Sequence, residues 1–131
     1  MAKRLSLTLL PDSIAICRLE PQAAVPEWVT SAPWWSMTRT TDEFSIVCAE
    51  RCVPEGIVAS RGWRALRFAG PLPLDQTGIL ASVTTPLAAA RVSVFALATY
   101  DTDYVLIPAA QRAAAIEALE RAGHSVGSAG Y

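Results

Sequence analysis

Polar and apolar residues alternate with a period of two in the first half of the chain, which is typical of strands with one buried face. This alternation predicts a strand over residues 4–10, and Pro11-Asp12-Ser13 then provides turn-forming residues before a returning strand over 14–19. Residues 34–40 and 44–48 are rich in aromatic and β-branched side chains, which favour strands. They flank a polar triplet, so we predict a β-hairpin.

The second half of the chain combines strand and helix periodicities. Residues 63–69 alternate, and apolar residues between 79 and 87 then recur at spacings of three and four, which indicates a helix. Asp75 or Thr77 is the expected N-cap of this helix, because each side chain can accept a hydrogen bond from an unpaired backbone N–H. Pro86 lies inside the apolar pattern and is expected to kink or shorten the helix.

A second hairpin is predicted over residues 92–98 and 104–107, and a strongly helical segment follows over 109–122. Residues 125 and 126 remain for a final short strand. The resulting order, β-α-β-β-α-β, is that of a ferredoxin-like split βαβ unit. We therefore predict an α+β fold with antiparallel sheets and with helices on one face.

The two predicted hairpins superpose when the sequence is shifted by about sixty residues, which places 35–47 over 95–107. In each hairpin an aromatic residue opens the first strand, and an acidic residue, Glu43 or Asp103, precedes an aromatic residue in the second strand. We interpret this pattern as an internal duplication.

The duplication divides the chain into two predicted units, residues 1–60 and residues 61–131. A unit of about 60 residues buries too little surface to be very stable alone. Association of the two halves would bury more apolar surface and cover exposed sheet edges. A ligand cleft is then expected at the interface of the two units.

The composition narrows the classes of function. Eleven basic and twelve acidic residues leave a net charge of −1, so the chain lacks the positive charge that nucleic acids and anionic membranes attract. The mean hydropathy of +0.30 indicates a folded domain, yet no apolar run approaches the roughly 20 residues of a membrane-spanning helix. The alternating N-terminus and the odd number of cysteines favour a cytoplasmic protein.

Residues that usually carry catalysis are sparse. Cys48 and Cys52 form a C-x3-C pair and His124 is the single histidine, whereas a closed zinc site needs about four nitrogen or sulfur ligands. Thiol catalysis would require His124 to lie beside a cysteine as a base. His124 directly follows a glycine that is expected to end a helix, a position that favours a structural role. We therefore expect no catalytic residue, no metal and no cofactor.

One loop and one carboxylate point to small-molecule binding. Residues 70–80 lead from a predicted strand into a predicted helix, and backbone N–H groups at a helix N-terminus bind carboxylates. Gly78 allows a ligand to approach the backbone closely, although the loop alone is more typical of an ordinary connection between a strand and a helix. Asp103 lies in the first turn of the returning strand, where its carboxylate can pair with an ammonium group.

Several motifs together resemble those of ACT domains. They are Trp63-Arg64-Ala65-Leu66, Gly70-Pro71-Leu72, Thr77-Gly78-Ile79-Leu80-Ala81, Pro86-Leu87-Ala88 and above all Thr99-Tyr100-Asp101-Thr102-Asp103-Tyr104-Val105-Leu106. In particular the chain resembles small bacterial tandem-ACT proteins, which are related to the regulatory domains of aspartate kinases and to the cytosolic arginine sensors of animals. The resemblance implies two ACT-like βαββαβ units side by side. The first unit is expected to be degenerate, because no long helix is predicted between Leu19 and Trp34.

The resemblance also implies a ligand site. The positions that match the loop and helix start, where backbone groups meet the ligand's carboxylate, are Asp75, Thr77, Gly78, Ile79 and Leu80. The strand-turn positions that face the ligand's amino group are Thr99, Tyr100 and Asp103. One departure from the expected pattern is Arg91, which stands where a helix-ending glycine is expected.

The leading interpretation is a non-catalytic regulatory protein that senses an amino acid or a similar small metabolite at the interface of two ACT units. Its partners would be that ligand and either a second copy of the chain or a separate regulated protein, with no nucleic acid and no membrane. A purely structural protein-interaction module, in which side chains close the cleft, is one alternative. A small enzyme that depends on a thiol or a carboxylate is the other.

Overall fold

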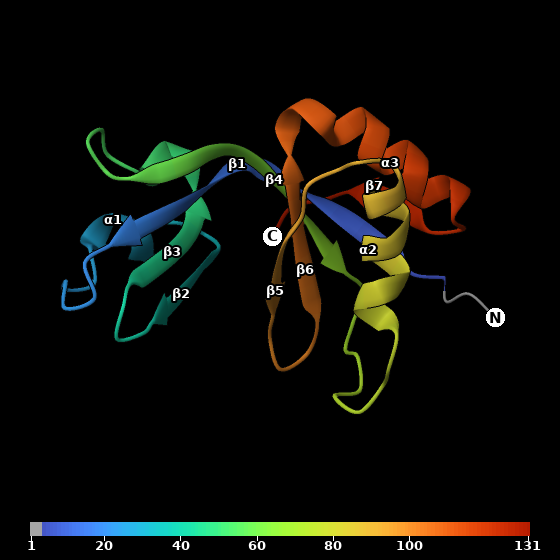
Figure 1. Ribbon diagram of the computed structural model, residues 1–131, viewed down its shortest axis with the longest axis horizontal. Coiled ribbons are helices and arrows are strands. Elements are labelled where there is room, and N and C mark those ends of the chain that lie inside the picture. Colours follow the sequence, from blue (N-terminus) through green and yellow to red (C-terminus); the bar gives the residue numbers. More distant parts are fainter. Residues whose placement is uncertain (1–3) are drawn as a thin grey trace. The chain divides into compact units, whose positions relative to one another are not determined.

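The computed structural model describes residues 4–131, which fold into two compact units (Figure 1). We call Asp12–Trp63, together with Tyr131, the first unit. Among the described residues, the second unit consists of 4–11 and of Arg64–Gly130. Each unit has its own hydrophobic core, and each is described separately below.

Two long strands contribute residues to both units. They are β1 (Ser6–Leu19) and β4 (Ala59–Phe68), so the units interleave along the sequence. The division of the chain into residues 1–60 and 61–131 stays a prediction, and residues 1–3 of the predicted first part lie outside the described residues.

The second unit is built in the order β4-α2-β5-β6-α3-β7. Its further elements are α2 (Ile79–Ala89), β5 (Phe95–Ala98), β6 (Asp103–Pro108), the short 3-10 helix η2 (Ala109–Gln111), α3 (Arg112–Arg121) and β7 (Ser125–Ser128). Its strands lie in the order β7-β1-β4-β6-β5, with β5 antiparallel to β6 and β7 parallel to β1. The predicted α+β, ferredoxin-like βαββαβ unit is confirmed, and β1 is inserted between β7 and β4.

The two helices of the second unit lie side by side and cover one face of its strands (Figure 1). Alternate strand residues point toward them, as the period of two requires. The helices contribute apolar residues at spacings of three and four. The strand residues in this core are Leu7, Leu9, Leu66, Phe68, Val105 and Ile107, and the helix residues are Ile79, Val83, Leu87, Ala115 and Leu119.

The first unit keeps the strands of such a fold but almost none of its helices. Its elements are the second part of β1, α1 (Glu27–Thr30), β2 (Trp35–Arg39), β3 (Phe44–Ala49), the 3-10 helix η1 (Glu50–Cys52) and the beginning of β4. Strand β3 lies between β2 and β1 and is antiparallel to both. Because α1 has only four residues, the first unit is degenerate, as the sequence predicted.

Strand β1 is continuous, which corrects the prediction of two strands joined by a turn. Pro11-Asp12-Ser13 lies inside β1 instead of reversing the chain. On one side, β1 pairs with β7 over Ser6–Leu9 and with β3 over Ile14–Leu19. Pro11 falls between these two paired segments, so the N–H that proline lacks is not needed for either ladder.

The internal repeat is real in structure but its register differs from the sequence alignment. Strand β3 begins at Phe44 and β6 begins at Asp103, a shift of 59 residues. The 3-10 helices that follow, η1 and η2, begin at Glu50 and Ala109, with the same shift. Phe44 is therefore the residue of the first unit that corresponds in structure to Asp103. The sequence alignment, which matched Asp103 with Glu43, is wrong by one residue.

Helix α2 continues past Pro86 for three residues, which the sequence did not predict. Proline provides no N–H for the carbonyl four residues earlier, which belongs to Ser82. The buried His124 ring replaces that donor, since its Nε2 lies 2.9 Å from the Ser82 carbonyl oxygen. The Leu5 N–H donates to Nδ1 of the same ring at 3.0 Å, which leaves Nε2 as the nitrogen that can donate to the Ser82 carbonyl. Both ring nitrogens of His124 therefore contact backbone groups, which is a structural role.

The helices are short. Helix α2 has 11 residues and α3 has 10, and the first turn of the helix predicted over 109–122 is a 3-10 turn instead. No helix within residues 4–131 is long and apolar enough to cross a bilayer. After α2, Arg91 adopts a left-handed conformation with φ of 59°, the conformation for which a glycine was expected.

Candidate functional site

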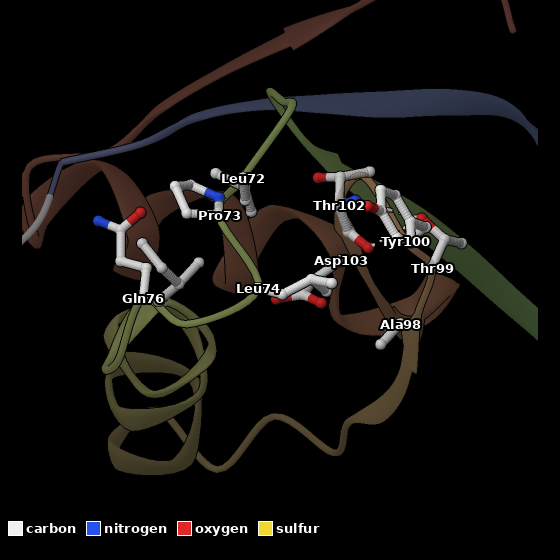
Figure 2. Close-up of a pocket in the computed structure, with 10 residues that line it drawn as sticks. Leu72, Pro73, Leu74, Gln76, Ala98, Thr99, Tyr100, Thr102 and Asp103 are labelled. Carbon is white, nitrogen blue, oxygen red and sulfur yellow. Dashed lines mark hydrogen bonds between the residues drawn. The ribbon is translucent and has the colours of Figure 1, made fainter.

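One pocket of the second unit lies between the loop that leads into α2 and the turn that joins β5 to β6. Figure 2 shows the loop side chains on one side and the hairpin side chains on the other. Its volume is about 240 Å³, which is below the roughly 300–1,000 Å³ of sites for drug-sized ligands and suits a small metabolite. The lining residues are Leu72, Pro73, Leu74, Gln76, Ile79, Ala98, Thr99, Tyr100, Thr102 and Asp103.

The loop over residues 69–78 is held firmly against the hairpin turn. The Leu72 N–H donates to the Asp101 carbonyl at 2.6 Å, and the Thr102 hydroxyl donates to the Phe68 carbonyl at 2.7 Å. A Cβ atom on Gly70 would lie 3.0 Å from the Asp101 carbonyl oxygen and 3.1 Å from the Thr102 Cβ. A side chain at this position would press on the turn, so glycine favours the close approach of the loop to the hairpin turn.

The hairpin turn is organised by Thr99. Its N–H donates to the Thr102 carbonyl at 2.8 Å, and its hydroxyl oxygen accepts the Thr102 N–H at 3.2 Å. Threonine stabilises such turns because its hydroxyl replaces a backbone group. Asp103 follows the turn as the first residue of β6, pairs with Ala98 of β5, and is half-buried in the pocket wall.

Helix α2 begins beside the pocket with its first donors uncapped. Its N-cap is Gly78, with φ of 80°, and no side chain among the described residues makes a capping hydrogen bond to it. The predicted N-caps, Asp75 and Thr77, are wrong, because both residues are exposed in the loop before the cap. The first helical hydrogen bond runs from the Ser82 N–H to the Gly78 carbonyl at 3.0 Å. The N–H groups of residues 79–81 therefore have no acceptor within the helix.

The structure brings four of the eight predicted site residues to the pocket wall. Ile79, Thr99, Tyr100 and Asp103 line it, and Asp103 is the charged member among the ten lining residues. The other four predicted residues do not line it and lie exposed next to Gln76 and Ile79 in the sequence: Asp75, Thr77, Gly78 and Leu80. Binding by any of the eight stays a prediction.

The prediction missed six lining residues. Two signals in the sequence point to the loop residues among them, namely the dense prolines around Leu72 and the apolar Leu74 in the connection between a predicted strand and a predicted helix. Leu74 is 72% exposed, an unusual position for a large apolar side chain. Ala98 and Thr102 carry no such signal, since small residues beside a turn are common.

The three cysteines, Cys17, Cys48 and Cys52, lie in the first unit. Cys17 and Cys48 are both buried. A hydrogen bond from the Cys48 thiol to Cys17 raises the pKa of Cys48, as does burial, and the same bond lowers the pKa of Cys17. Both ring nitrogens of His124 are already bonded within the second unit, at Leu5 and Ser82. The described residues contain no group of three or more His, Cys, Asp or Glu side chains placed to hold a metal ion.

Comparisons with known families match most of the chain. The sequence model of the ACT domain family matches residues 58–121. A second model, which describes an N-terminal domain, matches residues 12–56. The ACT match thus covers the whole of the pocket described above, and the second match falls within the first unit.

A curated relative is the cytosolic arginine sensor for mTORC1 subunit 1 of Mus musculus. It is 32% identical over 107 residues, which are 76% of this chain and 32% of that protein. The same sensor from Bos taurus is 39% identical over 67 residues, which are 50% of this chain and 20% of that protein. The chain therefore spans about a third or less of the length of these relatives.

Solved structures show the same fold along nearly the entire chain. A crystal structure of a protein from Agobacterium tumefaciens has a TM-score of 0.92 and 35% identity, and the match covers 99% of this chain and 97% of that one. The regulatory subunit of aspartate kinase from Thermus thermophilus has a TM-score of 0.59 and 12% identity, with 93% of this chain and 99% of that one covered. The second likeness shows the fold alone.

Proposed function

The chain belongs to the ACT-domain proteins, and we propose that it is a non-catalytic cytoplasmic sensor that binds an amino acid in the pocket of its second unit. A regulatory role in amino-acid sensing is supported by the relatives, one of which is described as a cytosolic arginine sensor. The regulated partner in this proposal is a separate protein or a second copy of the chain. Every lining residue of this pocket belongs to the second unit, so the proposed site differs from the cleft expected at the interface of the two units, which stays a prediction.

The pocket offers complementary groups for the two ends of an amino acid. The uncapped N–H groups at the start of α2 carry the positive end of the helix dipole, which favours a carboxylate. The carboxylate of Asp103 supplies an acceptor for the ligand's ammonium group. Leu74 and Tyr100 lie at the wall as apolar surface for the aliphatic part of the ligand.

The observation that carries the proposal is the shared location of these two groups. Ile79, the first residue of α2, and Asp103, the first residue of β6, line the same pocket, although 24 positions separate them in the sequence. The loop that leads into α2 is hydrogen-bonded to the hairpin turn, which supports a defined spacing of the two groups. A preformed wall lowers the entropy cost of binding a small molecule.

Thermal unfolding in the presence of each of the twenty amino acids tests the proposal. A bound ligand raises Tm by mass action, by an amount that grows with ligand concentration. Arginine is the first candidate, because the pocket's charged residue is acidic and the curated relatives are described as arginine sensors. Stabilisation should be lost in Asp103→Asn, because the charge-assisted bond to the ligand is removed. The matched control is Asp101→Asn, since Asp101 lies in the same turn outside the pocket lining.

A protein-interaction module is the second candidate, and one observation favours it. Leu74 and Tyr100 are 72% and 81% exposed at the pocket, and exposed large apolar side chains are common at partner surfaces. In that case no amino acid raises Tm, and Asp103→Asn unfolds like the unmodified chain. The thermal experiment therefore separates the two candidates.

A further inference from the structure

The first unit contains a structural counterpart of the hairpin that forms one wall of the pocket. At the shift of 59 residues, β3 and η1 coincide with β6 and η2. The turns before them are also equivalent: the Thr40 N–H donates to the Glu43 carbonyl at 2.8 Å, as the Thr99 N–H does to the Thr102 carbonyl. In each unit a loop also leads from the preceding strand into the following helix, namely residues 20–26 between β1 and α1 and residues 69–78 between β4 and α2.

The residues at the wall differ between the two copies. Arg39 pairs with Phe44 across the hairpin of the first unit, as Ala98 pairs with Asp103 in the second. The short side chain of Ala98 leaves room in the second unit, where the pocket is open. At the equivalent position of the first unit, the chain carries a long cationic side chain.

The Arg39 guanidinium spans the gap between the turn and the loop. It lies over the Phe44 ring, 4.1 Å from the ring centre. Its two terminal nitrogens donate to loop carbonyls, one to Pro21 and the other to Ala23, the latter at 2.7 Å. The planar fork of a guanidinium matches two neighbouring acceptors, and its face stacks on an aromatic ring.

We propose that Arg39 is a built-in occupant of a second, self-filled copy of the pocket, so that each chain offers one open site and one closed site. The closed copy accepts an alkylguanidinium group through the Pro21 and Ala23 carbonyls and the Phe44 ring. Removal of the Arg39 side chain should create a binding site for a free alkylguanidinium ion. This inference concerns the first unit and holds whether or not the second unit binds an amino acid.

Chemical rescue of Arg39→Ala in the full chain tests this inference. The atoms removed beyond Cβ correspond to N-ethylguanidinium, so this cation at about 20 mM is the probe. Loss of the side chain should lower Tm by a few degrees, and the probe should raise it again by about 3 °C in a saturable manner. N-ethylammonium has the same positive charge but lacks the planar guanidinium group. It should therefore raise Tm by less than half as much.

The matched control is Arg18→Ala, which also removes an exposed guanidinium that donates to a carbonyl of this hairpin, that of Asp42. Neither this variant nor the unmodified chain should gain stability from the probe. Equal responses of all three proteins, or no response of Arg39→Ala, would overturn the proposal. If Arg39→Ala does not fold, recovery of its folded circular dichroism signal by the probe supports the proposal, and failure of recovery contradicts it.

A measurement on the unmodified chain adds a readout that does not depend on a variant. A guanidinium held by two carbonyls and a ring rotates slowly, so the Arg39 side-chain N–H protons should give resolved resonances in NMR spectra. The control is Arg112, an exposed residue at the start of α3. Averaged signals from Arg39, like those of a freely rotating side chain, would contradict a fixed occupant.

Discussion

At the scale of single residues, Gly70 determines how closely the loop approaches the hairpin turn. Because a Cβ here would press on the Asp101 carbonyl and on Thr102, we expect Gly70→Ala to push the loop away from the turn. The lost hydrogen bonds and the strain should lower the free energy of unfolding by about 1–3 kcal/mol. Chemical denaturation measures this change.

The control for this variant is Gly127→Ala. A Cβ on Gly127 meets no atom within 4 Å, so its unfolding free energy should change by less than about 1 kcal/mol. Equal losses in the two variants would show that the close approach of the loop does not matter. Amino-acid binding should weaken only in Gly70→Ala, because Gly127 lies in β7, outside the pocket.

At Arg91 we predict a substitution that raises the free energy of unfolding instead of lowering it. A non-glycine residue in the left-handed region costs roughly 1 kcal/mol, so Arg91→Gly should stabilise the chain by up to about 1 kcal/mol. Urea denaturation should show a higher midpoint with an unchanged slope. Arg112→Gly, a control at the start of α3, should destabilise instead, because glycine is a poor helix former.

Some single residues could be recognised from the sequence and others could not. Asp103 and Arg91 stood out because an acid beside a turn and a missing glycine are local signals. The role of Arg39 required the true register of the repeat, which differs by one residue from the best sequence match. The turn threonines, Thr40 and Thr99, set that register through backbone hydrogen bonds that residue similarity does not reveal.

At the scale of elements, α2 depends on a side chain from outside the helix. His124 donates to the carbonyl that Pro86 leaves without a partner and also accepts the Leu5 N–H. His124→Phe leaves both backbone groups unpaired, so we expect a loss of about 2 kcal/mol in the free energy of unfolding.

A double-mutant cycle tests this explanation. Pro86→Ala supplies an N–H that can reach the Ser82 carbonyl, so the cost of His124→Phe should be about 1 kcal/mol smaller in that background. In a Pro33→Ala background, which alters an exposed proline of the first unit, the cost should not change. If His124→Phe lowers the free energy of unfolding equally in all backgrounds, His124 does not compensate for the N–H that Pro86 lacks.

The β5–β6 hairpin provides a prediction that follows from comparing the two units. Ala98→Arg introduces into the open pocket the side chain that fills its counterpart. The added guanidinium should reach Asp103 and block the pocket, so amino-acid binding should weaken at least about tenfold. Calorimetric titration measures the affinity. Ala96→Arg, at an exposed position on the same strand, is the control and should bind normally.

Element boundaries illustrate where sequence patterns are informative. Strong periodicity located both hairpins, and both helices of the second unit, within a few residues. The turn predicted at Pro11-Asp12-Ser13 was wrong because the residues have turn chemistry but lie in a gap between two strand pairings. Tertiary pairing determined the outcome there, and local sequence does not encode it.

At the scale of the whole molecule, the ACT fold of the second unit followed from the order of its elements. The insertion of β1 between β7 and β4 did not, because it depends on a strand that precedes the repeat in the sequence. The sequence also does not reveal that one copy of the pocket is open and the other filled, because this difference depends on which side chain faces which loop. Because one copy is open and the other is filled, we expect each chain to bind one ligand.

The central claim is that the pocket of the second unit binds an amino acid between the start of α2 and the turn before β6. Titration of the ¹⁵N-labelled chain with each of the twenty amino acids, followed by amide NMR spectra, tests it most directly. We predict saturable shifts for at least one amino acid, concentrated at residues 79–81 and 99–103. Absence of shifts with all twenty, or saturable shifts confined to other parts of the chain, would contradict the claim.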